Sequence, residues 1–153
     1  WSLGGGLSYT DAKYDGAVIP CSNGSFDGAS AIAKCSVDGQ RIGGEPNWSA
    51  SLNSEYVVPM DHVEAYVRGL YKFTDSRAND DIADGDVTSY GVFNLYAGVR
   101  SNDGNWEVGA WVKNLLDTEA EVRRYPEESP GYRKVEVLNE RSLGLTAKYN
   151  FSL

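Results

Sequence analysis

The sequence predicts an all-β fold, an antiparallel up-and-down transmembrane β-barrel to which these 153 residues contribute six strands. Three observations support this prediction. Six segments alternate apolar and polar residues, the connections between them are alternately short and long, and aromatic residues gather at both ends of the segments. Alternation over about 9 to 12 residues matches the ~9 to 11 residues that a tilted barrel strand needs to cross a bilayer.

The six segments are predicted strands because a period of two places different solvents on the two faces of a sheet. In the third segment the charged residues stay on one face, and in the last the apolar row ends in Tyr149 and Phe151. In chain order the segments are residues 1–10, 48–58, 63–74, 90–100, 106–115 and 141–151.

The connections predict the orientation. Short turns lie at residues 59–62 and 101–105, and long loops at residues 11–47, 75–89 and 116–140. Outer-membrane barrels have short periplasmic turns and long extracellular loops. We therefore expect a multi-pass protein of the bacterial outer membrane with a periplasmic C-terminus.

The aromatic residues offer an independent check, since amphipathic rings collect at the two membrane–water interfaces. One predicted rim holds Trp1, Tyr56, Trp106, Tyr149 and Phe151, and the other holds Tyr9, Trp48, Tyr71, Phe73 and Phe93. The alternative is a soluble β-sandwich, whose strands also alternate but which needs no aromatic rims.

Composition excludes several classes of function. Acidic residues outnumber basic ones, 22 to 14, and a pI of about 4.6 disfavours nucleic acid as a partner. The single histidine, His62, lies at a predicted turn without a nucleophile beside it, so neither a catalytic triad nor a histidine metal site can be assembled. We expect no enzyme, no metal site and no cofactor.

The predicted sheet has two unpaired edges, residues 1–10 and 141–151. Each unpaired backbone group in hydrocarbon costs several kcal/mol, so six strands cannot close alone. We expect the sequence to be part of a longer polypeptide, with the missing strands supplied by upstream residues or by other copies.

The run NLYAGVRSNDGNWEVGAWVKNLLD, residues 94–117, resembles the penultimate hairpin of TonB-dependent outer-membrane receptors. In that family a short acidic Gly turn, a Trp-led strand and an Asn-Leu-x-Asp ending recur. The ending is matched here by Asn114, Leu115, Leu116 and Asp117. Residues 43–56 resemble a strand of that family that runs toward the periplasm, and residues 63–77 resemble the next strand, which runs outward.

The resemblance spans residues 1–153 and implies the C-terminal part of a barrel of about 22 strands. It also implies a plug domain and a TonB-contacting motif, neither of which is recognisable here, and the active uptake of an extracellular ligand. Iron–siderophore complexes are the commonest ligands of the family. The alternative is a passive porin or an adhesin-like barrel.

Expected partners are the lipid bilayer, lipopolysaccharide, the TonB system and a small-molecule ligand. Tyr149 and Phe151 would form the assembly signal, although the family usually stops nearer an aromatic and here Ser152 and Leu153 follow.

Cys21 and Cys35 lie 14 positions apart in the first long loop and are predicted to form a disulfide, because outer-membrane loops mature through an oxidising compartment. A metal-binding thiol pair is the alternative, but histidine or acidic ligands at zinc-like spacing are lacking.

The third long loop is the predicted ligand contact, since cations mixed with aromatic rings suit an anionic, ring-bearing ligand. The alternative is that these residues only pack loop against loop. The predicted residues are Arg123, Arg124, Tyr125, Tyr132, Arg133 and Lys134, with Trp111 and Lys113 lining the same mouth. The acidic second loop, with Asp75, Asp80, Asp81, Asp84 and Asp86, is expected to be a solvated loop, and a calcium site is the alternative.

Overall fold

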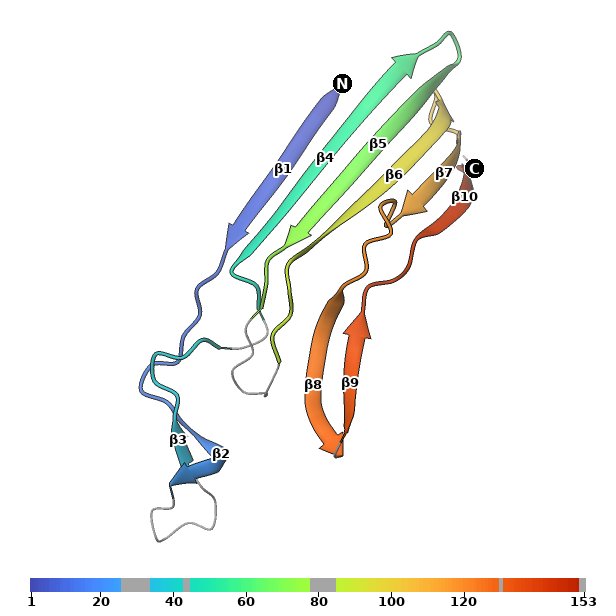
Figure 1. Ribbon diagram of the computed structural model, residues 1–153. Coiled ribbons are helices and arrows are strands. Elements are labelled where there is room, and N and C mark those ends of the chain that lie inside the picture. The colour runs from blue at the N-terminus through green and yellow to red at the C-terminus, as the bar shows by residue number, and fades with distance from the viewer. Residues whose placement is uncertain (26–33, 43–44, 78–84, 130, 152–153) are drawn as a thin grey trace.

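The computed structural model describes the chain outside residues 26–33, 43–44, 78–84, 130 and 152–153. None of the described residues lies in a helix that could cross a membrane. The principal element is a six-stranded antiparallel sheet in the order β1-β4-β5-β6-β7-β10 (Figure 1). Its strands are β1 (Ser2–Tyr9), β4 (Trp48–Pro59), β5 (Val63–Thr74), β6 (Tyr90–Ser101), β7 (Trp106–Lys113) and β10 (Ser142–Tyr149).

All six predicted strands are present, in an order that follows the chain. β5 matches the prediction at both ends, and the ends of the other strands differ from it by at most two residues. The largest internal difference is at β7, which ends at Lys113 because Asn114 has a φ of 51° and turns the chain out of the sheet. β1 and β10 are the two edges of the sheet.

Two smaller hairpins, which the sequence did not predict, lie within the long loops. β2 (Val18–Ser25) pairs with β3 (Lys34–Ser36), and β8 (Glu121–Ser129) pairs with β9 (Tyr132–Val137). Both pairs contain register shifts. Neither pair therefore keeps the strict alternation by which a strand is recognised in a sequence.

The six-stranded sheet is a single layer with almost no interior of its own (Figure 1). Among the described residues, the only buried hydrophobic side chains are Val37, Tyr66 and Val87. The apolar row of each strand is exposed, with Leu3, Leu7, Leu52, Val108, Leu143 and Leu145 all at least half accessible. A β-sandwich would pack a second sheet on this face, so the described strands do not support the soluble alternative.

The two faces of the sheet differ completely in charge. All charged side chains of the six strands lie on one face, five basic and three acidic, whereas the whole chain carries a net charge of −8. They are Glu55, Glu64, Arg68, Lys72, Arg100, Glu107, Lys113 and Lys148. We call this the polar face and the opposite one the apolar face.

The two ends of the sheet also differ. At the short-turn end lie the β4–β5 and β6–β7 turns, where Asn102 donates to the Met60 and Asp61 carbonyls and Gly104 has a φ of 74°. At the long-loop end the Tyr9 and Trp48 rings lie 4.6 Å apart. Exposed aromatic residues are found at both ends, as predicted: Trp1, Tyr56, Trp106 and Tyr149 at the first, and Tyr9, Trp48 and Tyr71 at the second.

Candidate functional site

A row of alternating charges crosses the polar face near the short-turn end. Glu64, Arg100, Glu107 and Lys148 stand directly opposite one another on β5, β6, β7 and β10. Directly opposed charges of opposite sign stabilise neighbouring strands. The row therefore requires this register, because a one-residue slip would move these side chains to the apolar face.

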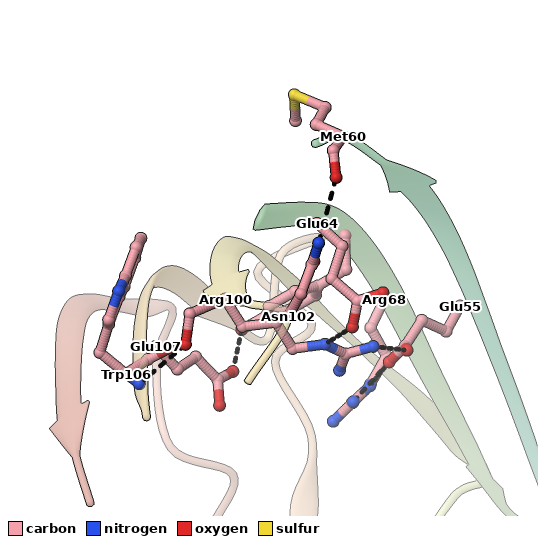
Figure 2. Close-up of polar contacts among 10 residues, drawn as sticks. Glu55, Met60, Glu64, Arg68, Arg100, Asn102, Trp106 and Glu107 are labelled. Atoms are coloured by element: carbon pink, nitrogen blue, oxygen red, sulfur yellow. Dashed lines mark hydrogen bonds and ion pairs between the residues drawn. The ribbon is translucent and has the colours of Figure 1, made fainter. Parts of the chain in front are cut away.

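The row is joined to a second ion pair on β4 and β5 (Figure 2). Arg100 pairs with Glu64, and its other nitrogen lies 3.5 Å from Glu55. Glu55 in turn pairs with Arg68, which stands opposite it on β5. Because Glu55 is only 17% exposed, this carboxylate depends on both arginines for the compensation of its charge.

Tyr66 lies at the centre of these charges. Its hydroxyl donates to Glu107 over 2.6 Å, and the guanidinium carbons of Arg68 and Arg100 lie 5.7 and 5.3 Å from its ring centroid. The ring needs the two glycines across the sheet. A Cβ added at Gly98 would lie 2.8 Å from the tyrosine hydroxyl and 2.6 Å from the Val108 carbonyl oxygen, and one added at Gly109 would lie 2.9 Å from the hydroxyl. Glycine at both positions therefore gives Tyr66 its place on the wall.

Towards the long-loop end the polar face forms a trough of about 420 Å³. Trp111 stacks under Lys113, whose ammonium lies 5.0 Å from the indole centroid, and the Trp111 nitrogen donates to Thr146 over 3.2 Å. The trough is lined by three cations and one carboxylate, so it is electropositive; the residues are Tyr66, Arg68, Tyr96, Glu107, Gly109, Ala110, Trp111, Lys113, Thr146 and Lys148.

The β8–β9 hairpin carries a second group of cations and rings, which we call the hairpin cluster: Arg123, Tyr125 and Lys134. The Arg123 guanidinium carbon and the Lys134 ammonium lie 5.9 and 4.9 Å from the Tyr125 ring centroid. Both cations thus face one aromatic ring, an arrangement that holds charged groups at the surface of the loop.

A cleft of about 700 Å³ lies at the base of this hairpin. Arg124 pairs with Glu121 and Arg141 pairs with Asp117, which leaves Glu119 and Glu140 to give the lining an acidic balance. Apolar atoms come from Ala120, Val137 and Leu138. Arg124 therefore lies in a different environment from the hairpin cluster.

The structure brings together some of the predicted ligand residues and separates others. Arg123, Tyr125 and Lys134 form one group, Trp111 and Lys113 a second, and Arg124 lines the acidic cleft. Tyr132 is exposed on β9, and Arg133 stands opposite Glu127 in the hairpin register. That all of them contact one ligand stays a prediction.

Three other predictions fall partly outside the described residues. β2 and β3 carry Cys21 and Cys35 on paired strands, with Ile19 opposite Cys35, but the side chain of Cys21 is not described. Asp80, Asp81 and Asp84 of the acidic loop lie outside the described residues. The described part contains no group of three potential metal ligands. At the C-terminal end the Tyr149 and Phe151 rings lie 4.7 Å apart and are exposed, and Ser152 and Leu153 are not described.

The sequence analysis missed the residues that organise the polar face. Alternation assigns each of them to one face of its own strand, but their partners depend on register; the residues are Glu55, Glu64, Tyr66, Arg68, Arg100 and Glu107. The signal that could have found them was the pair of glycines at equivalent heights on adjacent strands, Gly98 and Gly109, opposite Tyr66.

In a comparison with known protein families, a model described as TonB dependent receptor-like, beta-barrel matches residues 1–115. No curated protein and no solved structure matches the chain. The matched segment contains β1 to β7 and ends within the Asn114–Asp117 motif.

Proposed function

The chain belongs to the TonB-dependent receptor-like β-barrel family of outer-membrane transporters, and on this premise we propose that it forms wall and extracellular mouth of a receptor for a scarce small ligand. Further strands would pair with the open edges of β1 and β10 to close the barrel, since an unpaired strand edge is not stable in lipid. The ligand would cross with energy from the TonB system. The chain would have no enzymatic role and no resident cofactor.

The observation that carries this proposal is the one-sided distribution of charge. All charged side chains of the six strands lie on the polar face, and the apolar face exposes leucine, valine and aromatic side chains. A barrel wall needs this asymmetry because one face meets lipid and the other a wet lumen. We infer that the polar face lines the lumen, that the short-turn end is periplasmic, and that Tyr149 and Phe151 serve as the assembly signal.

For the ligand we propose an anionic, ring-bearing molecule of the iron–siderophore type. Support comes from the hairpin cluster and from the trough beside Trp111 and Lys113, which combine cations with aromatic faces. Such surfaces bind anions through charge and flat rings through stacking. Tyr132, Arg133 and Arg124 would contribute from the same hairpin.

Ligand binding can be tested with a ferric tris-catecholate complex as the probe and the full-length receptor in detergent. The variant in which Arg123, Tyr125 and Lys134 are all replaced by alanine is expected to bind the probe at least about tenfold more weakly by quenching of tryptophan fluorescence. Lys13→Ala removes an exposed loop cation that pairs with Asp11 and serves as the matched control. Equal affinity of the triple variant and the wild type would contradict the ligand site.

Energy coupling separates the proposal from the passive alternative. Uptake of the same probe by cells that carry the receptor is expected to stop when a protonophore collapses the proton gradient. Uptake that continues unchanged would favour a porin, and surface binding without uptake would favour an adhesin.

A further inference from the structure

The turn that leads from the wall into the β8–β9 hairpin has an unusual backbone. Asn114 and Asp117 have φ angles of 51° and 54°, and they are the only non-glycine residues with positive φ in the described part of the chain. Asparagine and aspartate tolerate this region better than other side chains. The chain therefore leaves β7 through a sharply defined turn.

The side chain of Asn114 joins the two legs of the hairpin, which are the segments that lead into β8 and out of β9. Its amide nitrogen donates to the carbonyl of Thr118 on the outgoing leg over 3.0 Å and to that of Asn139 on the returning leg over 3.1 Å. Its amide oxygen accepts the backbone N–H of Thr118 over 2.9 Å. Because the residue is only 4% exposed, few water molecules can replace these bonds.

Further bonds tie this base to the wall. The backbone N–H of Asn114 donates to the Asn94 side chain over 2.9 Å, and the Thr118 hydroxyl donates to the Gly91 carbonyl over 2.9 Å, both on β6. Asp117 accepts the backbone N–H of Arg141 over 3.0 Å and pairs with its guanidinium at 3.4 Å, just before β10. Asp117, Thr118 and Arg141 also line the 700 Å³ cleft.

We propose that Asn114 and Asp117 are positioning residues that hold the β8–β9 hairpin in one direction over the long-loop end of the barrel. The hairpin cluster is then presented in a fixed place, and a ligand does not have to order the loop when it binds. The inference rests on the proposed function only for the ligand that the hairpin meets. The Asn-Leu-x-Asp motif thereby gains a physical role: asparagine and aspartate supply both the turn and the ties.

Hydrogen exchange measured by mass spectrometry on the full-length receptor in detergent tests this role. Asn114→Gly keeps a residue that adopts positive φ without strain and removes only the side-chain bonds. Residues 116–121 and 137–141 are expected to exchange at least about tenfold faster, and β4 and β5 to exchange as in the wild type. The rise in exchange should be largest in these legs. Beyond them, β8 is held by a separate hydrogen bond, which Arg77 donates to the Val122 carbonyl.

Asn102→Gly is the matched control, since Asn102 also bonds two carbonyls through its amide, each over 3.2 Å, but at the short-turn end. It should leave exchange in the hairpin legs unchanged. Unchanged exchange in the Asn114→Gly legs, or a rise spread over the whole wall, would overturn the proposal. If Asn114→Gly does not assemble, Asn114→Asp keeps the acceptor for Thr118 and removes both donors, and the same local rise is expected. No ligand is used, so this result is independent of the ligand proposal.

Discussion

The two ends of the polar face are built differently. Near the short-turn end the charges are matched, with Glu64, Arg100, Glu107 and Lys148 alternating across four strands. Towards the long-loop end Lys72 and Lys113 stand on the strands without an opposed carboxylate, and Lys113 lines the trough. Matched charges stabilise strand register, whereas unmatched cations remain available to an anion. The first end therefore favours a fixed strand register, and the second carries the cations on which the proposed ligand site depends.

The largest difference in stability between the two ends is expected from Gly98→Ala. The new methyl group would press on the Val108 carbonyl oxygen and on Tyr66, and overpacking of this kind costs about 1–3 kcal/mol, here at the upper end because backbone is involved. For Gly144→Ala the three nearest atoms all belong to the Trp111 ring, a side chain at the border of the trough and not backbone, so the effect should be smaller. The measurement is the temperature at which the full-length barrel unfolds, seen as a change in its electrophoretic mobility. A decrease in this temperature for Gly144→Ala that equals or exceeds the decrease for Gly98→Ala would contradict the comparison.

The predicted disulfide at the long-loop end gives the next effect. A bond between Cys21 and Cys35 would close a loop of 14 positions and remove roughly 3 kcal/mol of unfolded-state entropy from that loop. We expect the native protein to take up two alkyl groups only after reduction, as measured by intact mass, with no change in the melting of the wall. Alkylation without reduction would disprove the bond.

Arg100→Met tests the matched row. The substitution removes the arginine that Glu64 and Glu55 share. Since these two side chains are 30% and 17% exposed, the free energy of unfolding of the six-stranded sheet is expected to fall by about 1–2 kcal/mol. Lys113→Met removes an exposed cation with no opposed carboxylate and should change stability by less than about 0.5 kcal/mol. Equal destabilisation by the two variants in thermal melts would remove the distinction between the ends.

The smallest effect concerns Asp103 in the β6–β7 turn. The Ser101 hydroxyl, followed by the Asn105 N–H groups, lowers the pKa of this carboxyl below its usual value. Its contribution to stability is therefore present above the unfolded-state pKa and is lost as the pH falls through the lower folded-state pKa. Between about pH 5 and about pH 2, Asp103→Asn should show a slightly smaller fall in melting temperature than the wild type.

The sequence predicted the wall better than the mouth, for a physical reason. Each strand of the wall separates two solvents, so Leu143 to Tyr149 shows a strict alternation that survives in the structure. β9 is exposed on both of its faces, and its pairing with β8 contains register shifts, so no such alternation exists. The acidic cleft escaped prediction because Arg124 and Arg141 find their partners only after the hairpin folds.

Within the wall, residue types could be assigned to a face, but not to a partner. Placing Tyr66 between Arg68 and Arg100, with its hydroxyl on Glu107, requires the relative positions of three strands. The Asn114–Asp117 motif was visible as a resemblance, and its hydrogen bonds to Thr118, Asn139 and Arg141 depend on both hairpin legs being in place.

The matched row has a consequence for depth in the membrane. It runs perpendicular to the strands, across three spacings of about 4.8 Å, and barrel strands tilt by about 40°, so from Glu64 to Lys148 it climbs by about 9 Å. In the proposed barrel, with the polar face lining the lumen, the four charged groups would follow a helical path around the inner wall. Each group would lie at its own height, so a ligand moving down the lumen would meet them one after another.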